Sequence, residues 1–230
     1  MKLKKIITMG LAAVMTVSAM SISAFAADSI PQGAVMSVTA PDGNGKIYLT
    51  REDVKNGKTS LKGYGGVVFT YIEDIAAEAA MAAAENNDLI TSGDASVNAI
   101  SASTLYFNST NVPGLVSPIN CYNSSASGNF TTPSSSQRFS DNAIYHGTNT
   151  SAVMTVKPTT SITYGDAYIS LAAMNSSGVP IGVEGTVYPS GTGTSGIVAS
   201  GMSSGTYLYI YINNSMSSTI KGKITLSCAN

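Results

Sequence analysis

The sequence predicts a mainly β protein, an antiparallel β-sandwich of jelly-roll-like form preceded by an N-terminal arm with one α-helix. Three observations lead to this prediction. Past residue 95 polar and apolar residues alternate with period 2, turn residues interrupt the alternation at short intervals, and charged side chains become rare. Short alternating strands separated by Gly, Asn and Ser are typical of sandwiches and barrels.

The first 26 residues have the form of an export signal. A basic start at residues 1–5 precedes an uncharged apolar run at residues 6–22, and Ala24-Phe25-Ala26 matches a signal-peptidase site. A membrane anchor is the alternative, but polar residues such as Thr8 and Ser18 dilute the run. We therefore expect a secreted, extracellular protein that begins at Ala27 and has no membrane span after cleavage.

Charge divides the exported chain in two. Residues 27–94 hold 15 charged residues and residues 95–230 hold seven, which places an arm at 27–94 and the sandwich domain at 95–230. Three of the 12 basic residues lie in the leader, so nine remain against 13 acidic ones, a net charge of −4. Because no basic patch is present, the composition argues against nucleic acid as a partner.

The arm contains the one predicted helix. Thr70-Tyr-Ile-Glu73 has the form of a capping box, and apolar residues then recur at helical spacing, so we expect a helix over about residues 71–86. Its alanine-rich stripe suits a helix packed on the sheet or linking to it. Earlier in the arm, Asp42 and Asn44 match half of a calcium loop, but Arg51 replaces the final Glu. We expect a plain turn there, followed by a short helical segment at residues 50–53.

The sandwich region contains seven predicted strands. A long segment at 108–150, rich in Ser, Asn and Pro, is expected to form loops with one or two short strands. The seven strands are predicted at residues 97–107, 152–157, 167–174, 178–188, 196–200, 206–213 and 219–228.

Few residues could support catalysis. His146 is the one histidine, so a histidine metal site cannot form, and we expect no metal and no cofactor. Asp141 and His146 could complete a triad with Ser203, but no nucleophile motif fits, which favours a solvated loop histidine. Gly191-Thr-Gly-Thr-Ser-Gly196 and Gly201-Met-Ser-Ser-Gly205 match the letters of nucleotide-binding and nucleophile-elbow motifs. A strand rather than a helix follows each, so both are expected to be turns.

Tyr207, Tyr209 and Tyr211 alternate with Leu208, Ile210 and Ile212. If the aliphatic side faces the core, the tyrosines form an exposed row that could stack on sugar rings. The alternative is that the tyrosines pack inside the sandwich or beneath a loop. The sequence does not say which face is buried.

Cys121 and Cys228 are the two cysteines of the chain. Disulfides persist outside the cell, so we expect the pair to form a bridge that ties down the last strand. Two buried free thiols are the alternative.

Three segments carry a resemblance to a known family. They are Tyr168-Ile-Ser-Leu-Ala-Ala-Met-Asn-Ser-Ser-Gly178, Ser203-Ser-Gly-Thr-Tyr-Leu-Tyr209 and Thr219-Ile-Lys-Gly-Lys-Ile-Thr-Leu226. Together, over residues 168–226, they resemble the pre-peptidase C-terminal type of secreted β-sandwich domain. This resemblance implies a small non-catalytic, jelly-roll-like module associated with exported enzymes.

The sequence thus predicts a secreted, non-catalytic β-sandwich that acts as a binding or adhesion module. Its expected partner is a glycan or a surface protein. Two alternatives remain open at this point: a structural subunit of a surface layer or fibre, and a secreted serine hydrolase that uses His146.

Overall fold

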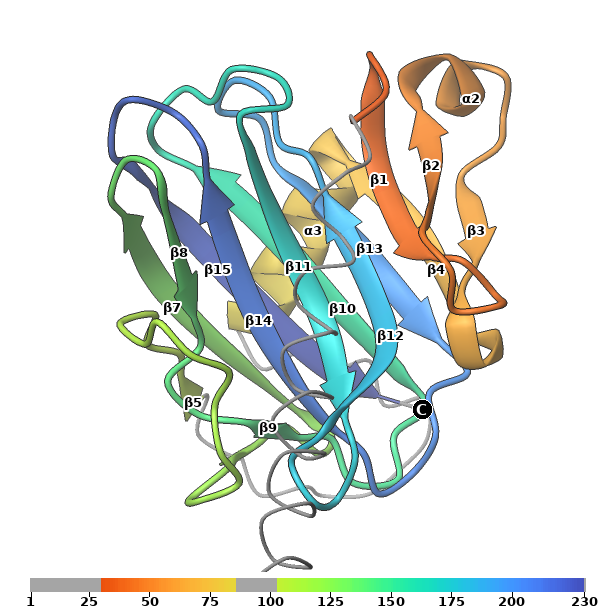
Figure 1. Ribbon diagram of the computed structural model, residues 1–230, viewed down its shortest axis with the longest axis vertical. Coiled ribbons are helices and arrows are strands. Elements are labelled where there is room, and N and C mark those ends of the chain that lie inside the picture. The colour runs from red at the N-terminus through yellow and green to blue at the C-terminus, as the bar shows by residue number, and fades with distance from the viewer. Residues whose placement is uncertain (1–29, 86–102, 230) are drawn as a thin grey trace, which may run out of the picture. The chain divides into compact units, whose positions relative to one another are not determined.

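Two β-sheets packed face to face form the body of the protein (Figure 1). The computed structural model describes residues 30–85 and 103–229. The eight-stranded sheet, here called sheet A, has the order β2 (Lys46–Thr50), β1 (Ala34–Thr39), β12 (Pro180–Val187), β11 (Ala167–Met174), β14 (Tyr207–Asn214), β9 (Ile144–Tyr145) and β6 (Ile119–Asn120), with β8 (Ser136–Phe139) also paired to β14.

The second sheet, sheet B, has seven strands. Their order is β3 (Ser60–Lys62), β4 (Val68–Glu73), β13 (Ser195–Ser200), β10 (Ser151–Pro158), β15 (Ile220–Ala229), β7 (Ser124–Thr132) and β5 (Ser103–Thr104). The long strands pair antiparallel, and only the short pairs β5–β7 and β6–β9 are parallel among the described residues. The predicted antiparallel β-sandwich is confirmed.

The predicted N-terminal arm is not separate from the sandwich. Strands β1 and β2 extend sheet A, while β3 and β4 extend sheet B. The charge shift near residue 95 misleads because the strand Ala34–Thr39 carries no charge at all. Much of the arm's charge instead lies in the two α-helices, α2 (Arg51–Lys55) and α3 (Asp74–Glu85).

The predicted helix exists but begins later than its local signal indicates. Strand β4 continues to Glu73 because Thr70 and Glu73 pair with Val198 and Ser195 of β13. Helix α3 then starts at Asp74. Pairing across the sheet outweighs the capping signal at Thr70. The short segment expected at 50–53 is confirmed as α2, whose Thr50 and Asp53 form a reciprocal capping box.

Helix α3 packs on the outer face of sheet B, against β4, β7, β10, β13 and β15 (Figure 1). Its small side chains Ala77 and Ala84 are buried, and the hydroxyl of Ser125 donates to the Ala84 carbonyl. Outside this contact, Lys157 pairs with Glu78 at 3.3 Å. The alanine stripe therefore allows the helix to lie close to a sheet face built of small residues.

The strands predicted beyond residue 150 are confirmed within a few residues at each end. The segment 108–150 contains more strand than predicted, including the nine-residue β7. Ser, Ala and Gly dominate β7, so its alternation carries little hydrophobic contrast. The predicted strand 97–107 lies partly outside the described residues, which contain only Ser103–Thr104 of it as β5.

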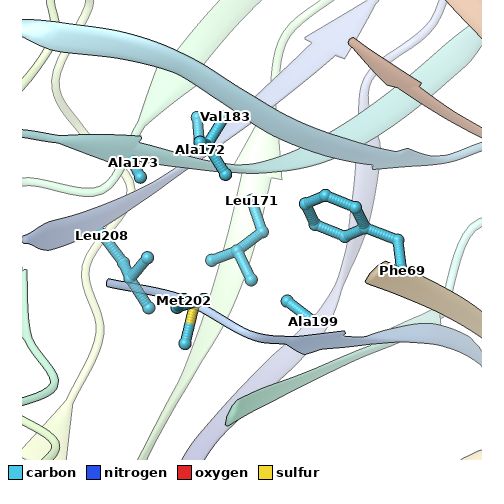
Figure 2. Close-up of a pocket in the computed structure, with 8 residues that line it drawn as sticks. All are labelled: Phe69, Leu171, Ala172, Ala173, Val183, Ala199, Met202 and Leu208. Atoms are coloured by element: carbon cyan, nitrogen blue, oxygen red, sulfur yellow. The ribbon is translucent and has the colours of Figure 1, made fainter. Parts of the chain in front are cut away.

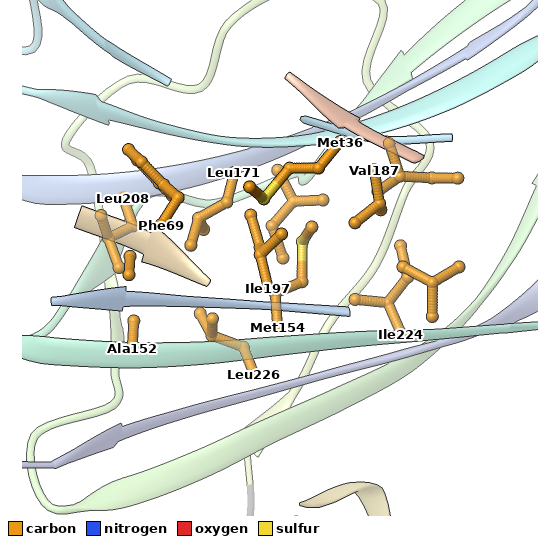
Figure 3. Packing of buried hydrophobic residues seen from close by; sticks show 14 of the residues in the cluster. Met36, Phe69, Ala152, Met154, Leu171, Val187, Ile197, Leu208, Ile224 and Leu226 are labelled. Atoms are coloured by element: carbon orange, nitrogen blue, oxygen red, sulfur yellow. The ribbon is translucent and has the colours of Figure 1, made fainter. Parts of the chain in front are cut away.

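Side chains from both sheets interdigitate in one hydrophobic core (Figure 3). Met36, Leu171 and Leu208 from sheet A meet Met154, Ile197 and Leu226 from sheet B, and all are at most 2 % exposed. Burial of such side chains stabilises the fold by about 1.5–3 kcal/mol each. Close packing also depends on glycine: a Cβ at Gly222 would lie 2.6 Å from the ring of Phe130.

The predicted disulfide is not formed, and both cysteines are free thiols in the core. The Cys121 thiol donates to the carbonyls of Ser124, at 3.3 Å, and Leu226, at 3.7 Å. A hydrogen bond with Cys121 and burial raise the pKa of the Cys228 thiol. Both effects favour a protonated, unreactive Cys228 thiol. Two buried free thiols are the alternative that the sequence left open.

A Gly222→Ala variant should lose about 1–3 kcal/mol of stability, because the added methyl meets Phe130 and the Lys157 carbonyl. Denaturant unfolding measures this loss. Gly114→Ala is the matched control, since nothing lies within 4 Å of its Cβ position. Equal stability of the two variants would contradict the packing described here.

The thiols should be inaccessible in the folded protein and free in the unfolded one. We expect no alkylation under native conditions and two labels per chain in denaturant without reductant, measured by intact mass. If labels appear in denaturant only after reduction, the cysteines form a bridge after all.

Candidate functional site

The alternation of β14 sends its aliphatic residues inward and its tyrosines outward. Leu208, Ile210 and Ile212 are at most 1 % exposed and belong to the core between the sheets. Tyr207, Tyr209 and Tyr211 therefore lie on the outer face of sheet A. The structure decides the question that the sequence left open, and it places the predicted residues on the face that the sugar-binding hypothesis requires.

The three tyrosines do not form an open row, which corrects the simple form of that hypothesis. Tyr209 is 7 % exposed, because Phe139, Ala143 and Met174 pack around it in a second hydrophobic cluster. Loop residues Val112 and Leu115 complete the cluster. Tyr207 instead contacts the exposed Tyr145, with ring centroids 5.3 Å apart.

Tyr211 belongs to a longer series of rings that crosses sheet A. We call this series the tyrosine belt; its members in order are Tyr48, Tyr188, Tyr168, Tyr211 and Phe139. Successive ring centroids lie 6.3, 6.1, 6.1 and 5.6 Å apart. These spacings allow aromatic pairs to stabilise each other beyond simple burial. The order of the rings follows the sheet from β2 past β1 to β12, β11, β14 and β8; β1 contributes no ring, and Tyr188 comes immediately after β12.

An ion pair lies beside the belt. Lys46 on β2 and Glu184 on β12 are 2.8 Å apart, and their side chains are 12 % and 13 % exposed. Glu184 also accepts hydrogen bonds from Tyr211 at 2.8 Å, Thr186 at 3.0 Å and Ser170 at 3.4 Å. The Lys46 ammonium is 5.6 Å from the centroid of Tyr168. Belt and ion pair are thus one connected network.

These contacts set the protonation of the network. Burial by itself raises the pKa of Glu184, but the charge of Lys46 and hydrogen bonds from Lys46, Tyr211 and Thr186 together hold it below its ordinary value. Burial and the neighbouring Glu184 carboxylate raise the pKa of Tyr211 well above 10. At neutral pH Glu184 is therefore a carboxylate and Tyr211 a neutral phenol.

Sequence reasoning found Tyr211 but missed the rest of the belt and the ion pair. A signal was present: Glu184 is the one charged residue between Asp166 and Lys221. Its partner Lys46 is 138 residues earlier in the chain, so only the pairing of β1 with β2 and β12 brings the two together.

His146 is fully buried rather than solvated, which corrects that prediction. Its Nδ1 lies 2.8 Å from the Asn149 carbonyl and its Nε2 lies 2.8 Å from the Thr206 hydroxyl. A carbonyl only accepts, so Nδ1 carries a proton that it donates to the Asn149 carbonyl. Burial lowers the pKa of His146, although the Asn149 contact opposes this shift.

The predicted triad residues do not converge. Asp141 accepts hydrogen bonds from the backbone of Asn108 and Ser109, which clamps the loop over Tyr209. Ser203 supplies only a backbone carbonyl, which accepts from Thr206 at 2.8 Å. Thr206, His146 and the Asn149 carbonyl have the order of nucleophile, base and orienting group, but the imidazole is 0 % exposed. The arrangement ties the loop between β9 and β10 to the loop between β13 and β14.

The other sequence motifs are turns, as predicted. Gly191 and Gly201 adopt φ values of 68° and 81°, and the strands β13 and β14 follow the two motifs. Asp42 accepts from the backbone of Asn44 at 2.9 Å within a turn. The described residues contain no group of three or more potential metal ligands. They also contain no helix long and apolar enough to cross a membrane.

Two hollows are relevant to ligand binding. Inside the sandwich, a cavity of about 10 Å³ is lined by apolar side chains, which Figure 2 shows converging from both sheets: Phe69, Leu171, Ala172, Ala173, Val183, Ala199, Met202 and Leu208. It is too small for an organic ligand. On the surface, a depression of about 380 Å³ is lined by Ser135, Ser136, Gln137, Asn213, Asn214 and Ser215.

We expect the ion pair to make the stability of the folded protein depend on pH. Because the folded-state pKa of Glu184 is lowered, its contribution to stability is present above the ordinary pKa of 4.5 and is lost as pH falls through the folded value. A Glu184→Gln variant should show a flatter stability profile below pH 4.5 in denaturant titrations. Glu52→Gln, at an exposed carboxyl on α2, is the control and should retain the wild-type profile.

No protein-family model matches the chain, and no curated protein matches it at a significant level. The resemblance of residues 168–226 to pre-peptidase C-terminal domains therefore stays a prediction.

Proposed function

We propose that this chain is an exported, non-catalytic β-sandwich module that binds a ligand through the outer face of sheet A. The observation that carries the proposal is the tyrosine belt beside the Lys46–Glu184 pair. Aromatic side chains with a few placed polar groups are the usual composition of ligand sites. The leader at residues 1–26, which lies outside the described residues, supports export.

The surroundings of His146 favour a binding protein over a serine hydrolase. Both ring nitrogens are engaged in holding loops, and Asp141 anchors a different loop. A general base must reach the proton of a substrate-accessible nucleophile. In the described part of the chain, neither hollow includes His146 or Thr206 in its lining.

The second candidate is a structural subunit that joins its neighbours through sheet edges. Edge strands that recruit other chains are usually long and flat, whereas short edges with lysines oppose pairing. Here β3 has three residues and includes Lys62, β2 has five and includes Lys46, and β6 has two. These edges favour the binding module.

The test compares the leader-free protein with a Tyr168→Ala variant on glycan and protein arrays. The Tyr168→Ala variant lacks the central ring of the belt and should not capture the ligand that the wild type captures, because the rings on either side lose their common neighbour. Tyr106→Ala is the control: Tyr106 is 57 % exposed and is not part of the belt. Melting curves must show that Tyr168→Ala folds.

Equal capture by Tyr168→Ala and wild type would refute the assignment of the binding face. A hydrolytic activity that disappears in His146→Ala but not in Tyr168→Ala would show that the protein is an enzyme rather than a binding module.

A further inference from the structure

The outer face of sheet A extends beyond the belt into the polar depression. Asn213 lies directly opposite Tyr168 on the neighbouring strand, and Gln137 lies opposite Asn213. Both amide side chains line the depression, and both are partly exposed. Aromatic rings and hydrogen-bonding groups therefore form one continuous surface over β8, β14 and β11.

Charge on this face is balanced. The strand residues that share the face with the belt include two charged side chains, Lys46 and Glu184, and these neutralise each other at 2.8 Å. The other polar groups on the face are uncharged: the hydroxyls of Ser37 and Ser170 are fully buried, whereas the amides of Gln137 and Asn213 are partly exposed. A ligand of high charge of either sign would meet no complementary field here.

The apolar character of the face is aromatic rather than aliphatic. Within the described residues, the large aliphatic side chains most exposed to solvent lie elsewhere: Val68 on β4, Ile75 on α3, Val116 in a loop, and Val179 between β11 and β12. A surface that binds another protein is usually enriched in Met and Arg as well as in aromatic residues. Partly exposed rings beside amide groups instead match a ligand that has apolar ring faces and many hydroxyls.

We infer that sheet A binds an uncharged, extended glycan that lies across the strands, over the partly exposed rings of the belt, with its hydroxyls toward Gln137 and Asn213 in the depression. This inference rests on the proposed function and names its ligand class. The partly exposed rings of the belt, Tyr48, Tyr168 and Tyr211, lie on β2, β11 and β14. Neighbouring strands are about 4.8 Å apart, so a linear chain of sugars that lies across the strands meets more than one ring as it lengthens.

Calorimetry with neutral oligosaccharides of glucose, mannose and xylose, from two to six units, tests the inference, with polygalacturonate as the acidic comparison. At least one neutral series should bind, with affinity rising about tenfold or more with length, a gain of 1.4 kcal/mol. Raising the salt concentration should change this affinity little, because no net charge is involved.

Four variants locate the ligand. Tyr168→Phe keeps the ring and should bind like wild type, whereas Tyr168→Ala should lose about tenfold or more. Gln137→Ala should weaken binding less than Tyr168→Ala does, because the depression contributes hydrogen bonds rather than stacking. Tyr106→Ala should leave binding unchanged, and circular dichroism and melting curves confirm that each variant folds.

The outcomes separate this inference from the proposed function. Salt-sensitive binding of polygalacturonate alone, or capture only of proteins in a manner that depends on Tyr168, would overturn the neutral-glycan inference and leave the binding face standing. If folded wild type binds no neutral oligosaccharide, no acidic polymer and no arrayed protein, both are overturned.

Discussion

The period-2 geometry of strands β11 and β14 is the constraint on which the rest of the structure depends. Successive side chains of a strand point to opposite faces of the sheet. Each residue whose side chain enters the core therefore places the next residue on the outer face of the sheet. Leu208, Ile210 and Ile212 cannot be buried between the sheets unless Tyr207, Tyr209 and Tyr211 point away from them. A register slip of one residue would exchange core and belt.

The two outer faces of the sandwich are covered in different ways. Sheet B presents small side chains, which allows helix α3 to pack directly on it with its alanines. Sheet A presents large aromatic rings, which pack on one another and beneath the loop clamped by Asp141. The first arrangement buries a flat surface against a helix. The second leaves Tyr48, Tyr168 and Tyr211 partly exposed, and for this reason we propose sheet A as the binding face.

The polar network on sheet A shows how a sandwich holds a charge at a nearly buried position. Glu184 is 13 % exposed, and an isolated carboxylate there would be costly. Lys46 supplies the opposite charge, and three hydroxyl groups donate to the same carboxylate oxygen. Such a network specifies which side chains face each other across β2, β12, β11 and β14, and so it orients the tyrosine rings around it.

What the sequence determined by itself was the class of fold and most of the strands beyond residue 150, because both follow from alternation and turn residues that act over a few neighbours. It also placed Tyr211 in the candidate site. The tertiary structure decided the rest: that the N-terminal segment supplies strands to both sheets, that Thr70 lies in a strand, and that Cys121 and Cys228 are free thiols. It also joined Lys46, Tyr168 and Glu184 to Tyr211. These features depend on contacts between segments that are distant in the sequence, up to 138 residues apart for Lys46 and Glu184. Local patterns carry no information about which strands become neighbours.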